Sequence, residues 1–288
     1  MIEITLPLQL DRLDEIDEHL LEVGDARWMV LQDVISPAAK LVGVFASQDE
    51  ADTAWQQLRE GTALLAEAGT PEFRVLADED WRDSYKAHFK SWNFGRLHWV
   101  PIWERASYHL PASDVVIWLD PGMAFGTGNH ETTRLCCERL VTLAVSTNLS
   151  GAVLDAGCGS GILALSAARL GFGKVEGFDN DAEAVRISQE NAAVNGLAGR
   201  VNFFVGDLIS GLADRTARIV LANIQADVLI RFAPNLSRAV EPGGALVLSG
   251  ILAREIDQVR AAFESVAPTW NSESKILGEW ADLLLLRP

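Results

Sequence analysis

From residue 152 to residue 250 the chain alternates between short apolar runs and longer segments whose apolar residues recur at helical spacing. The apolar runs predict strands in residues 152–161 (AVLDAGCGSG, a strand and its glycine-rich turn), 174–179, 201–207, 217–224 and 244–250. The segments between them predict helices at 162–171, 182–196 and 225–240. Because strands separated by helices pair in parallel, we expect a sheet covered by helices on both faces.

The end of the chain breaks this alternation. After a predicted helix at 253–266, residues 274–287 (SKILGEWADLLLLR) are typical of two strands around GEWA. Because this turn is too short to hold a crossover helix, the last pair of strands must be antiparallel. We therefore predict a doubly wound, seven-stranded α/β domain over residues 119–288 that ends in an antiparallel pair.

The first 75 residues predict a separate, smaller domain. Strand-like runs at 2–8, 26–34, 40–47 and 72–77 are interrupted by two amphipathic segments, one with apolar residues from Leu10 to Leu20 and one from Ala51 to Leu65. The order βαββαβ is that of the ferredoxin-like α+β arrangement. Some RNA-binding modules share it, but these strands lack the paired aromatic motif of such modules.

Residues 76–118 are interpreted as a connector between the two domains. Five of the nine tryptophans lie between residue 81 and residue 118. Such an aromatic stripe favours a packing seam between domains, although one tryptophan facing a substrate stays an alternative.

The net charge of −16 argues against a nucleic-acid surface, because phosphate binding requires clustered Lys and Arg. Residues 1–74 alone hold fifteen acidic and five basic side chains, a net charge of −10. We therefore expect a basic protein partner and no direct nucleic-acid binding. A merely solvated acidic face is the alternative.

Cysteine usage points to a reducing compartment, and the length of the apolar runs argues against a membrane-spanning segment. Three cysteines, two of them neighbours in sequence, predict reduced thiols and a cytoplasmic location. The N-terminus lacks the features of a signal peptide, and the longest apolar runs are too short to span a bilayer. We expect a monomer with no membrane segment. The five histidines show no metal-ligand spacing, so no metal is expected.

Two glycine-rich segments are candidate ligand loops. Residues 122–133 (GMAFGTGNHETT) lack the lysine of a triphosphate-binding loop. Residues 155–161 (DAGCGSG) have the spacing GxGxG, with Ile162 where a dinucleotide-binding turn has its third glycine, which argues against an NAD-dependent oxidoreductase. Asp179 follows Gly157 by 22 residues, at a strand end from which a carboxylate reaches ribose hydroxyls.

Together these features resemble the class I S-adenosylmethionine-dependent methyltransferases. The segments 119–133, 154–171, 178–196, 220–236 and 242–252 closely resemble successive motifs of the bacterial ribosomal protein L11 methyltransferase family, and FGTGNHETT is the most specific of these. The resemblance covers residue 78 to the C-terminus. It implies methyl transfer from S-adenosylmethionine to lysine or α-amino groups of ribosomal protein L11, with the N-terminal domain recognising the substrate.

The resemblance implies donor contacts by Thr133, Gly157, Asp179 and Asn223. Further candidates for donor binding are Gly126, Thr127, Asp155, Gly159 and Asp207. Plain structural roles are the alternatives for three of these residues: a helix-supporting hydroxyl for Thr133, a helix cap for Asn223 and a turn residue for Asp207.

Methyl transfer requires an oriented, neutral amine, and Asn223 is the candidate that orients it without acting as a base. His130 is a candidate proton acceptor, with a loop-shaping hydrogen bond as the favoured alternative.

Two residues depart from the family's usual pattern: Glu131 stands where Pro is common, and Gln225 stands where Leu is common. The substrate is therefore the least constrained part of the prediction. The alternatives are a methyltransferase of another protein lysine, such as one on an electron-transfer flavoprotein, a methyltransferase of a small amine, and a binding module without catalysis.

Overall fold

The computed structural model describes residues 1–23, 25, 27–32, 39–60, 65, 69–75, 90–119 and 130–288. The chain divides into two units, residues 1–88 and 89–288. Each unit has its own apolar core. The described residues 90–118, which the sequence analysis assigned to a connector, therefore group with the larger unit.

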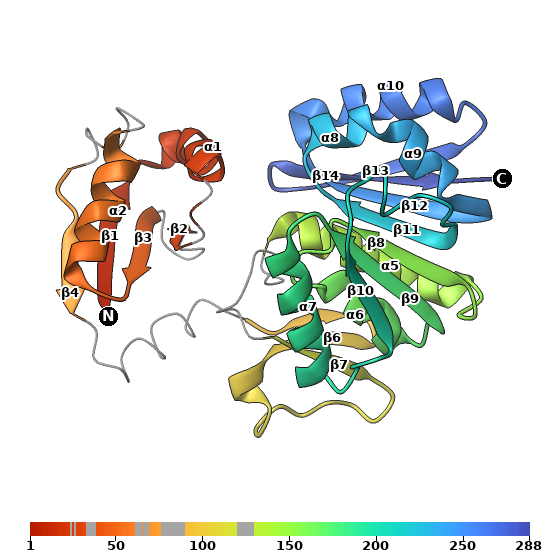
Figure 1. Cartoon of the computed structure of the whole chain (residues 1–288), viewed down its shortest axis with the longest axis horizontal. Coiled ribbons are helices and arrows are strands. Elements are labelled where there is room, and N and C mark those ends of the chain that lie inside the picture. Colours follow the sequence, from red (N-terminus) through yellow and green to blue (C-terminus); the bar gives the residue numbers. More distant parts are fainter. Residues whose placement is uncertain are drawn as a thin grey trace. The chain divides into compact units, whose positions relative to one another are not determined.

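The smaller unit contains a four-stranded antiparallel sheet in the order β2-β3-β1-β4 (Figure 1). Its elements are β1 (Ile2–Leu8), η1 (Leu10–Arg12), α1 (Leu13–Val23), β2 (Trp28–Gln32), β3 (Ala39–Phe45), α2 (Gln48–Glu60) and β4 (Glu72–Val75). Alternate residues of β1, such as Ile4 and Leu6, are buried with Ile16 of α1 and Leu58 of α2. The predicted order of strands and helices is present.

The larger unit is built on a seven-stranded sheet in the order β10-β9-β8-β11-β12-β14-β13. Its strands are β8 (Ala152–Ala156), β9 (Lys174–Asp179), β10 (Val201–Val205), β11 (Ala217–Asn223), β12 (Val240–Leu252), β13 (Asn271–Leu277) and β14 (Trp280–Leu286). The first five strands in this order pair in parallel, and β14 is antiparallel to both β12 and β13. The predicted antiparallel C-terminal pair is confirmed.

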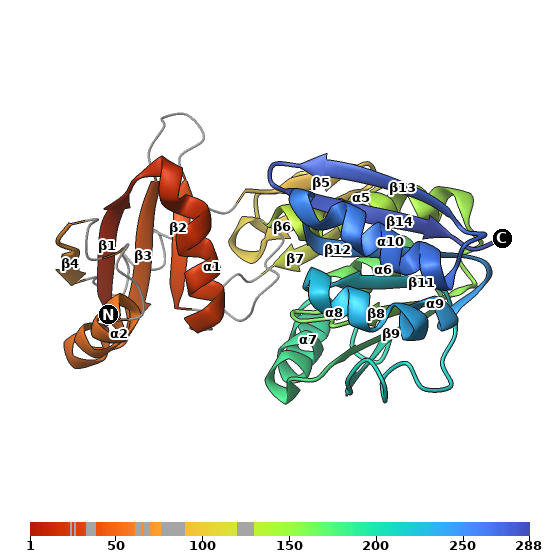
Figure 2. The same cartoon turned by 90° about the horizontal axis from the view of Figure 1, so that it is seen from above.

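Helices cover both faces of this sheet (Figures 1 and 2). They are α5 (Glu131–Ser146), α6 (Ile162–Leu170) and α7 (Ala182–Val194) on one face, and α8 (Ala226–Arg231), α9 (Ala233–Arg238) and α10 (Ile256–Val266), preceded by η4 (Ala253–Glu255), on the other. Successive strand residues face opposite cores: Leu221 packs with the first group of helices and Val220 with the second.

The single helix predicted at 225–240 is wrong, because two helices occupy that segment. They meet at Phe232, and α9 has Pro234 in its first turn. A proline lacks the N–H that would continue the hydrogen-bond ladder and clashes with the carbonyl four residues before it. The helical periodicity on both sides concealed this interruption.

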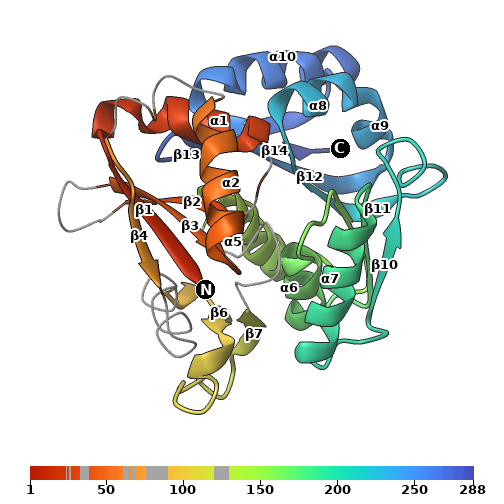
Figure 3. The same ribbon diagram turned by 60° about the vertical axis from the view of Figure 1, so that its left-hand side comes forward.

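A small three-stranded sheet lies within the larger unit, where no strands were predicted. It consists of β5 (Trp92–Phe94), β6 (Leu97–Pro101), followed by η3 (Ile102–Glu104), and β7 (Val115–Leu119). Figure 3 shows β6 and β7 near α6, which contacts both strands. Trp99 is fully buried there and donates from Nε1 to Ser166 of α6 at 2.9 Å. Trp99 therefore packs inside one unit, and not in a seam between domains as the sequence analysis expected.

All three cysteines are buried and unpaired. Burial raises the pKa of Cys136 and of Cys137 well above the usual range, so both thiols stay protonated at neutral pH. Within the described ranges, no helix combines the length and hydropathy that crossing a membrane requires.

Candidate active site

The candidate residues lie where parallel strands end at one edge of the larger sheet. β8 ends at Ala156, β9 at Asp179, β10 at Val205 and β11 at Asn223. From β8, the strands β9 and β10 extend the sheet in one direction, while β11 and β12 extend it in the other. Open α/β sheets bind ligands at such a reversal, beyond the carboxyl ends of the strands.

The turn after β8 depends on glycine. Gly157, Gly159 and Gly161 have φ angles of 75°, 51° and 77°, which side-chain-bearing residues rarely adopt. A Cβ on Gly157 would lie 2.6 Å from Cγ2 of Ile224, and one on Gly161 would lie 2.8 Å from the Phe203 ring. The turn therefore packs closely against the end of β11, and the N–H groups of Gly157 and Cys158 both donate to the carbonyl oxygen of Phe178 at the end of β9.

Asp155 and Asp179 place two carboxylates around this turn. Asp155 is 1% exposed, and it accepts the N–H of Ala164 at 3.0 Å. Burial raises the pKa of Asp155 to about 7; the bond from Ala164 opposes this rise and the charge of Asp179 adds to it. The two oxygens of Asp179 each accept one backbone N–H, from Gly159 at 2.9 Å and from Asp181 at 3.0 Å. Each oxygen keeps a second lone pair for a ligand hydroxyl.

Thr133 and Asn223, 90 residues apart in sequence, contact each other directly. Thr133 lies in the first turn of α5 and is 1% exposed, and its Oγ1 accepts a hydrogen bond from Nδ2 of Asn223 at 3.2 Å. The helix-cap interpretation of Asn223 is wrong, because Gln225 occupies the N-cap position of α8, without a side-chain cap bond, and Asn223 lies two residues before it. The carbonyl oxygen of Asn223 takes no part in the bond to Thr133, so it can accept from a ligand.

His130 caps the N-terminus of α5. Its Nδ1 accepts the N–H of Thr132 and lies 2.8 Å from that residue's hydroxyl. The ring packs edge-on against Trp280, with centroids 4.8 Å apart. Burial lowers the pKa of His130, while Glu131 opposes this and Arg134 adds to it. This geometry supports the loop-shaping role that the sequence analysis favoured.

The remaining candidates are Asp207, Gly126 and Thr127. Asp207 is exposed, and its Oδ1 accepts hydrogen bonds from Ile209 and from both the N–H and hydroxyl of Ser210. The backbone bond from Ser210 is the largest cause that lowers the pKa of Asp207. The turn role therefore uses one oxygen and leaves Oδ2 as an acceptor for a ligand. Gly126 and Thr127 lie outside the described residues.

Sequence reasoning missed Gly250 and Trp280, which both lie near the candidate residues. A Cβ on Gly250 would lie 2.4 Å from the carbonyl oxygen of Ile224, so Ile224 is held between Gly157 and Gly250. Trp280 comes from the C-terminal strand pair, and its signal was only the GEWA turn.

The two departures from the family pattern leave the site intact: Glu131 accepts a hydrogen bond from Arg134 at 2.9 Å, and Gln225 is exposed.

The residues assembled here fit S-adenosylmethionine. Glycines keep the turn after β8 free of side chains, Asp179 has acceptor positions for ribose hydroxyls, and carboxylates nearby suit a ligand with sulfonium and ammonium charges. Among the residues that the structure describes, no group of three or more His, Cys, Asp or Glu side chains could hold a metal ion. The sheet order, the glycine turn and the carboxylate after the second strand define a class I S-adenosylmethionine-dependent methyltransferase.

Comparison with known proteins gives the family. The family model described as "Ribosomal protein L11 methyltransferase (PrmA)" matches residues 14–287. A ribosomal protein L11 methyltransferase of Pelobacter propionicus is 38% identical, over 99% of this chain and 97% of that one, and one of Trichlorobacter lovleyi is 43% identical over 78% and 75%.

A solved structure agrees. The crystal structure of a ribosomal protein L11 methylase from Lactobacillus delbrueckii subsp. bulgaricus matches with a TM-score of 0.61 and 30% identity, over 69% of this chain and 99% of that one. The chain belongs to the ribosomal protein L11 methyltransferase family and is an S-adenosylmethionine-dependent protein methyltransferase.

Proposed function

We propose that this enzyme transfers methyl groups from S-adenosylmethionine to amino groups of ribosomal protein L11. The observation that carries the proposal is the hydrogen bond between Thr133 and Asn223, which joins the HETT motif of α5 to the end of β11. It brings two predicted donor contacts together at the strand edge that holds the glycine turn and Asp179. The family membership supports ribosomal protein L11 as the substrate.

The chain's own residues divide the work of binding. Asp179 would accept the ribose hydroxyls, and the turn at Gly157 would let the donor lie against the backbone. Thr133 would contact the amino-acid end of the donor. Asp155 accepts the N–H of Ala164 in the first turn of α6, directly after the glycine turn, so it would act on the donor through the backbone. Gly126, Thr127, Gly159 and Asp207 complete the proposed donor site.

Asn223 has the geometry to orient the amine. The donor supplies an electrophilic methyl group on a sulfonium, and the attacking nitrogen must first lose its proton, since a lysine has an ordinary pKa of about 10.4 and an α-amine about 8. The side-chain nitrogen of Asn223 is held by Thr133, so its carbonyl oxygen can accept an amine N–H and direct the lone pair. No side chain need act as a strong base, because an apolar pocket favours the neutral amine.

The smaller unit is proposed to be a ferredoxin-like substrate-recognition domain over residues 1–75. The methyltransferase domain is proposed to be the larger unit, which includes residues 90–118 besides the expected 119–288. The smaller unit's net charge of −10 over residues 1–74 is complementary to a basic ribosomal protein, and such complementarity speeds and orients association. We propose that the enzyme acts as a monomer in the cytoplasm, where its ribosomal substrate is made, and does not bind nucleic acid directly.

The test is transfer of labelled methyl from S-adenosylmethionine to purified ribosomal protein L11, in parallel with a bulk ribosomal-protein mixture and a small amine. Label on L11 alone is expected, and mass mapping then identifies the modified amines. Label only on another protein or on the amine would refute the proposed substrate and keep the methyltransferase. An Asn223→Ala variant with full turnover and donor affinity would exclude its orienting role.

A further inference from the structure

A row of three polar side chains on α5 crosses the sheet. Thr133, Cys136 and Arg139 are spaced three residues apart, so they form one ridge of the helix about 9 Å long. Thr133 contacts Asn223 of β11, the Cys136 thiol is hydrogen-bonded to Ser249 of β12, and Arg139 pairs with Asp282 of β14. These three strands are neighbours in the sheet, in that order.

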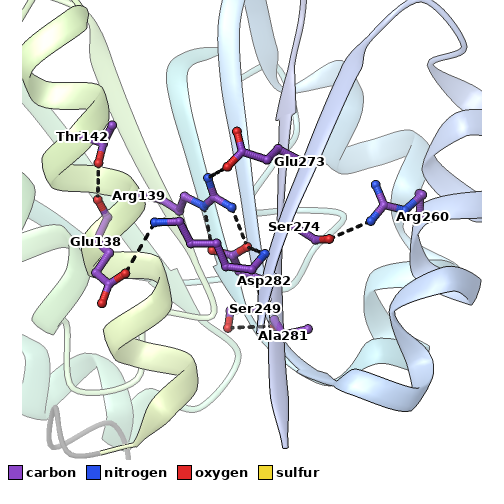
Figure 4. A network of polar contacts seen from close by, with 10 residues as sticks. Glu138, Arg139, Thr142, Ser249, Arg260, Glu273, Ser274, Ala281 and Asp282 are labelled. Carbon is purple, nitrogen blue, oxygen red and sulfur yellow. Dashed lines mark hydrogen bonds and ion pairs between the residues drawn. The ribbon is translucent and has the colours of Figure 1, made fainter. Parts of the chain in front are cut away.

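The Arg139–Asp282 pair is the strongest of these contacts (Figure 4). Arg139 is 4% exposed and Asp282 is fully buried, and the guanidinium donates from Nε and Nη2 to both carboxylate oxygens at 2.7 and 2.9 Å. Glu273 accepts from Nη1 at 2.7 Å, and the backbone N–H of Lys275 donates to Asp282 at 2.7 Å. The pair therefore has two hydrogen bonds, and each of its members has a further hydrogen-bond partner.

The location of this pair calls for a reason other than stability. Removing two charges from water offsets most of their attraction, so an apolar pair of similar volume stabilises a fold about as well. Apolar contacts, however, allow a helix to slide or rotate, whereas two parallel hydrogen bonds fix both movements. Around Arg139 the helix packs through apolar neighbours such as Leu140 and Leu143, which would not set its position alone.

We infer that Arg139 and Asp282 are positioning residues that set the axial position of α5 and thereby hold Thr133 against Asn223 at the donor site. This inference rests on the proposed donor site, though not on the identity of the protein substrate. Neither residue touches the donor site itself: the pair acts about 9 Å along the helix from Thr133, through the rigid backbone of α5.

The test is a double-mutant cycle read by the dissociation constant for S-adenosylhomocysteine, measured by calorimetry without any protein substrate. Thr133→Val is expected to weaken binding about three- to tenfold in the wild-type background, the worth of one hydrogen bond. Arg139→Met with Asp282→Leu, which removes both charges, is expected to weaken it by a similar factor. In that background Thr133→Val should have almost no further effect, because its contact is already misplaced.

Arg260→Met is the matched control, because Arg260 of α10 donates to Ser272 and Ser274 of β13 from the opposite face, as Figure 4 shows in part. It should leave donor-product binding unchanged. Arg139→Lys keeps the charge but cannot make two parallel hydrogen bonds, so it should weaken donor-product binding and reduce the effect of Thr133→Val. This variant keeps the test available if the protein with Arg139→Met and Asp282→Leu does not fold. The inference would be overturned if Thr133→Val and the double substitution of Arg139 and Asp282 had additive effects on the dissociation constant. Wild-type binding by Arg139→Lys would overturn it as well. Since the cycle measures only donor binding, its outcome is separate from whether ribosomal protein L11 is methylated.

Discussion

Replacing Gly157 by alanine tests the shape of the donor turn most sharply. At φ 75° an alanine occupies the left-handed region, which costs about 1–2 kcal/mol. Its Cβ would also lie 2.6 Å from Cγ2 of Ile224, and overpacking of this kind costs about 1–3 kcal/mol. The free energy of unfolding should therefore fall by about 2–5 kcal/mol, which in a unit of this size lowers the Tm by on the order of 10 °C.

The same substitution should damage the donor site. Relief of the clash requires the turn or the end of β11 to move, and Asn223 immediately precedes Ile224. We therefore expect the dissociation constant for S-adenosylhomocysteine to rise at least about tenfold. Calorimetric titration measures this effect, and thermal unfolding measures the stability loss on the same sample.

Gly171→Ala is the matched control for backbone strain. Gly171 ends α6 with φ 107°, and the nearest atom to its Cβ, on Leu149, is 3.5 Å away. It should lose stability through strain alone and bind the donor product normally. Adding Ile224→Ala to Gly157→Ala removes the clashing atom and should restore part of the stability. Normal donor-product binding by Gly157→Ala, despite a lower Tm, would refute the role assigned to the turn.

Three further predictions address other parts of the site. His130→Gln should leave the shape of the pH–rate profile unchanged, because burial lowers the pKa of His130 and its role is to cap α5; a lost alkaline or acidic limb would contradict this. Burial raises the pKa of Asp155 to about 7, above its unfolded value of about 4, so its contribution to stability is complete below pH ~4 and is lost as pH rises through ~7. Chemical denaturation should show wild-type stability falling relative to Asp155→Asn over that range by up to about 4 kcal/mol, and parallel pH profiles would count against it. Deleting residues 1–74 should abolish methylation of ribosomal protein L11 while donor-product binding persists, since each unit has its own core; normal methylation by the truncated enzyme would contradict the docking role.

Local patterns predicted the large sheet well, since each of its parallel strands is an apolar run between helical segments. The antiparallel end was predictable because only Gly278 and Glu279 separate β13 from β14. The break between α8 and α9 had a visible signal in Pro234, but the apolar spacing on both sides favoured one helix. The small sheet was missed because its strands are three to five residues long and β6 pairs in parallel with β7 across a long connection.

The sequence named candidate residues for the site but not the contacts between them. The resemblance to the family named Thr133 and Asn223 separately, and nothing local shows that their side chains meet across 90 residues. Arg139 gave no signal, because a charged residue within an amphipathic helix usually faces solvent. Asp282 lies in β14, and the sequence does not show which residue it pairs with. Their burial depends on the position of α5 over β14, which only the assembled sheet reveals.

The central claim is tested most directly by intact-mass measurement of purified ribosomal protein L11 after incubation with the enzyme and S-adenosylmethionine. The account predicts mass increases of whole methyl groups on lysine or α-amino nitrogens, matched by an equal amount of S-adenosylhomocysteine, and their loss with Asp179→Ala, which removes the acceptors proposed for the donor ribose. An unmodified L11 under conditions where the enzyme binds S-adenosylhomocysteine would contradict it.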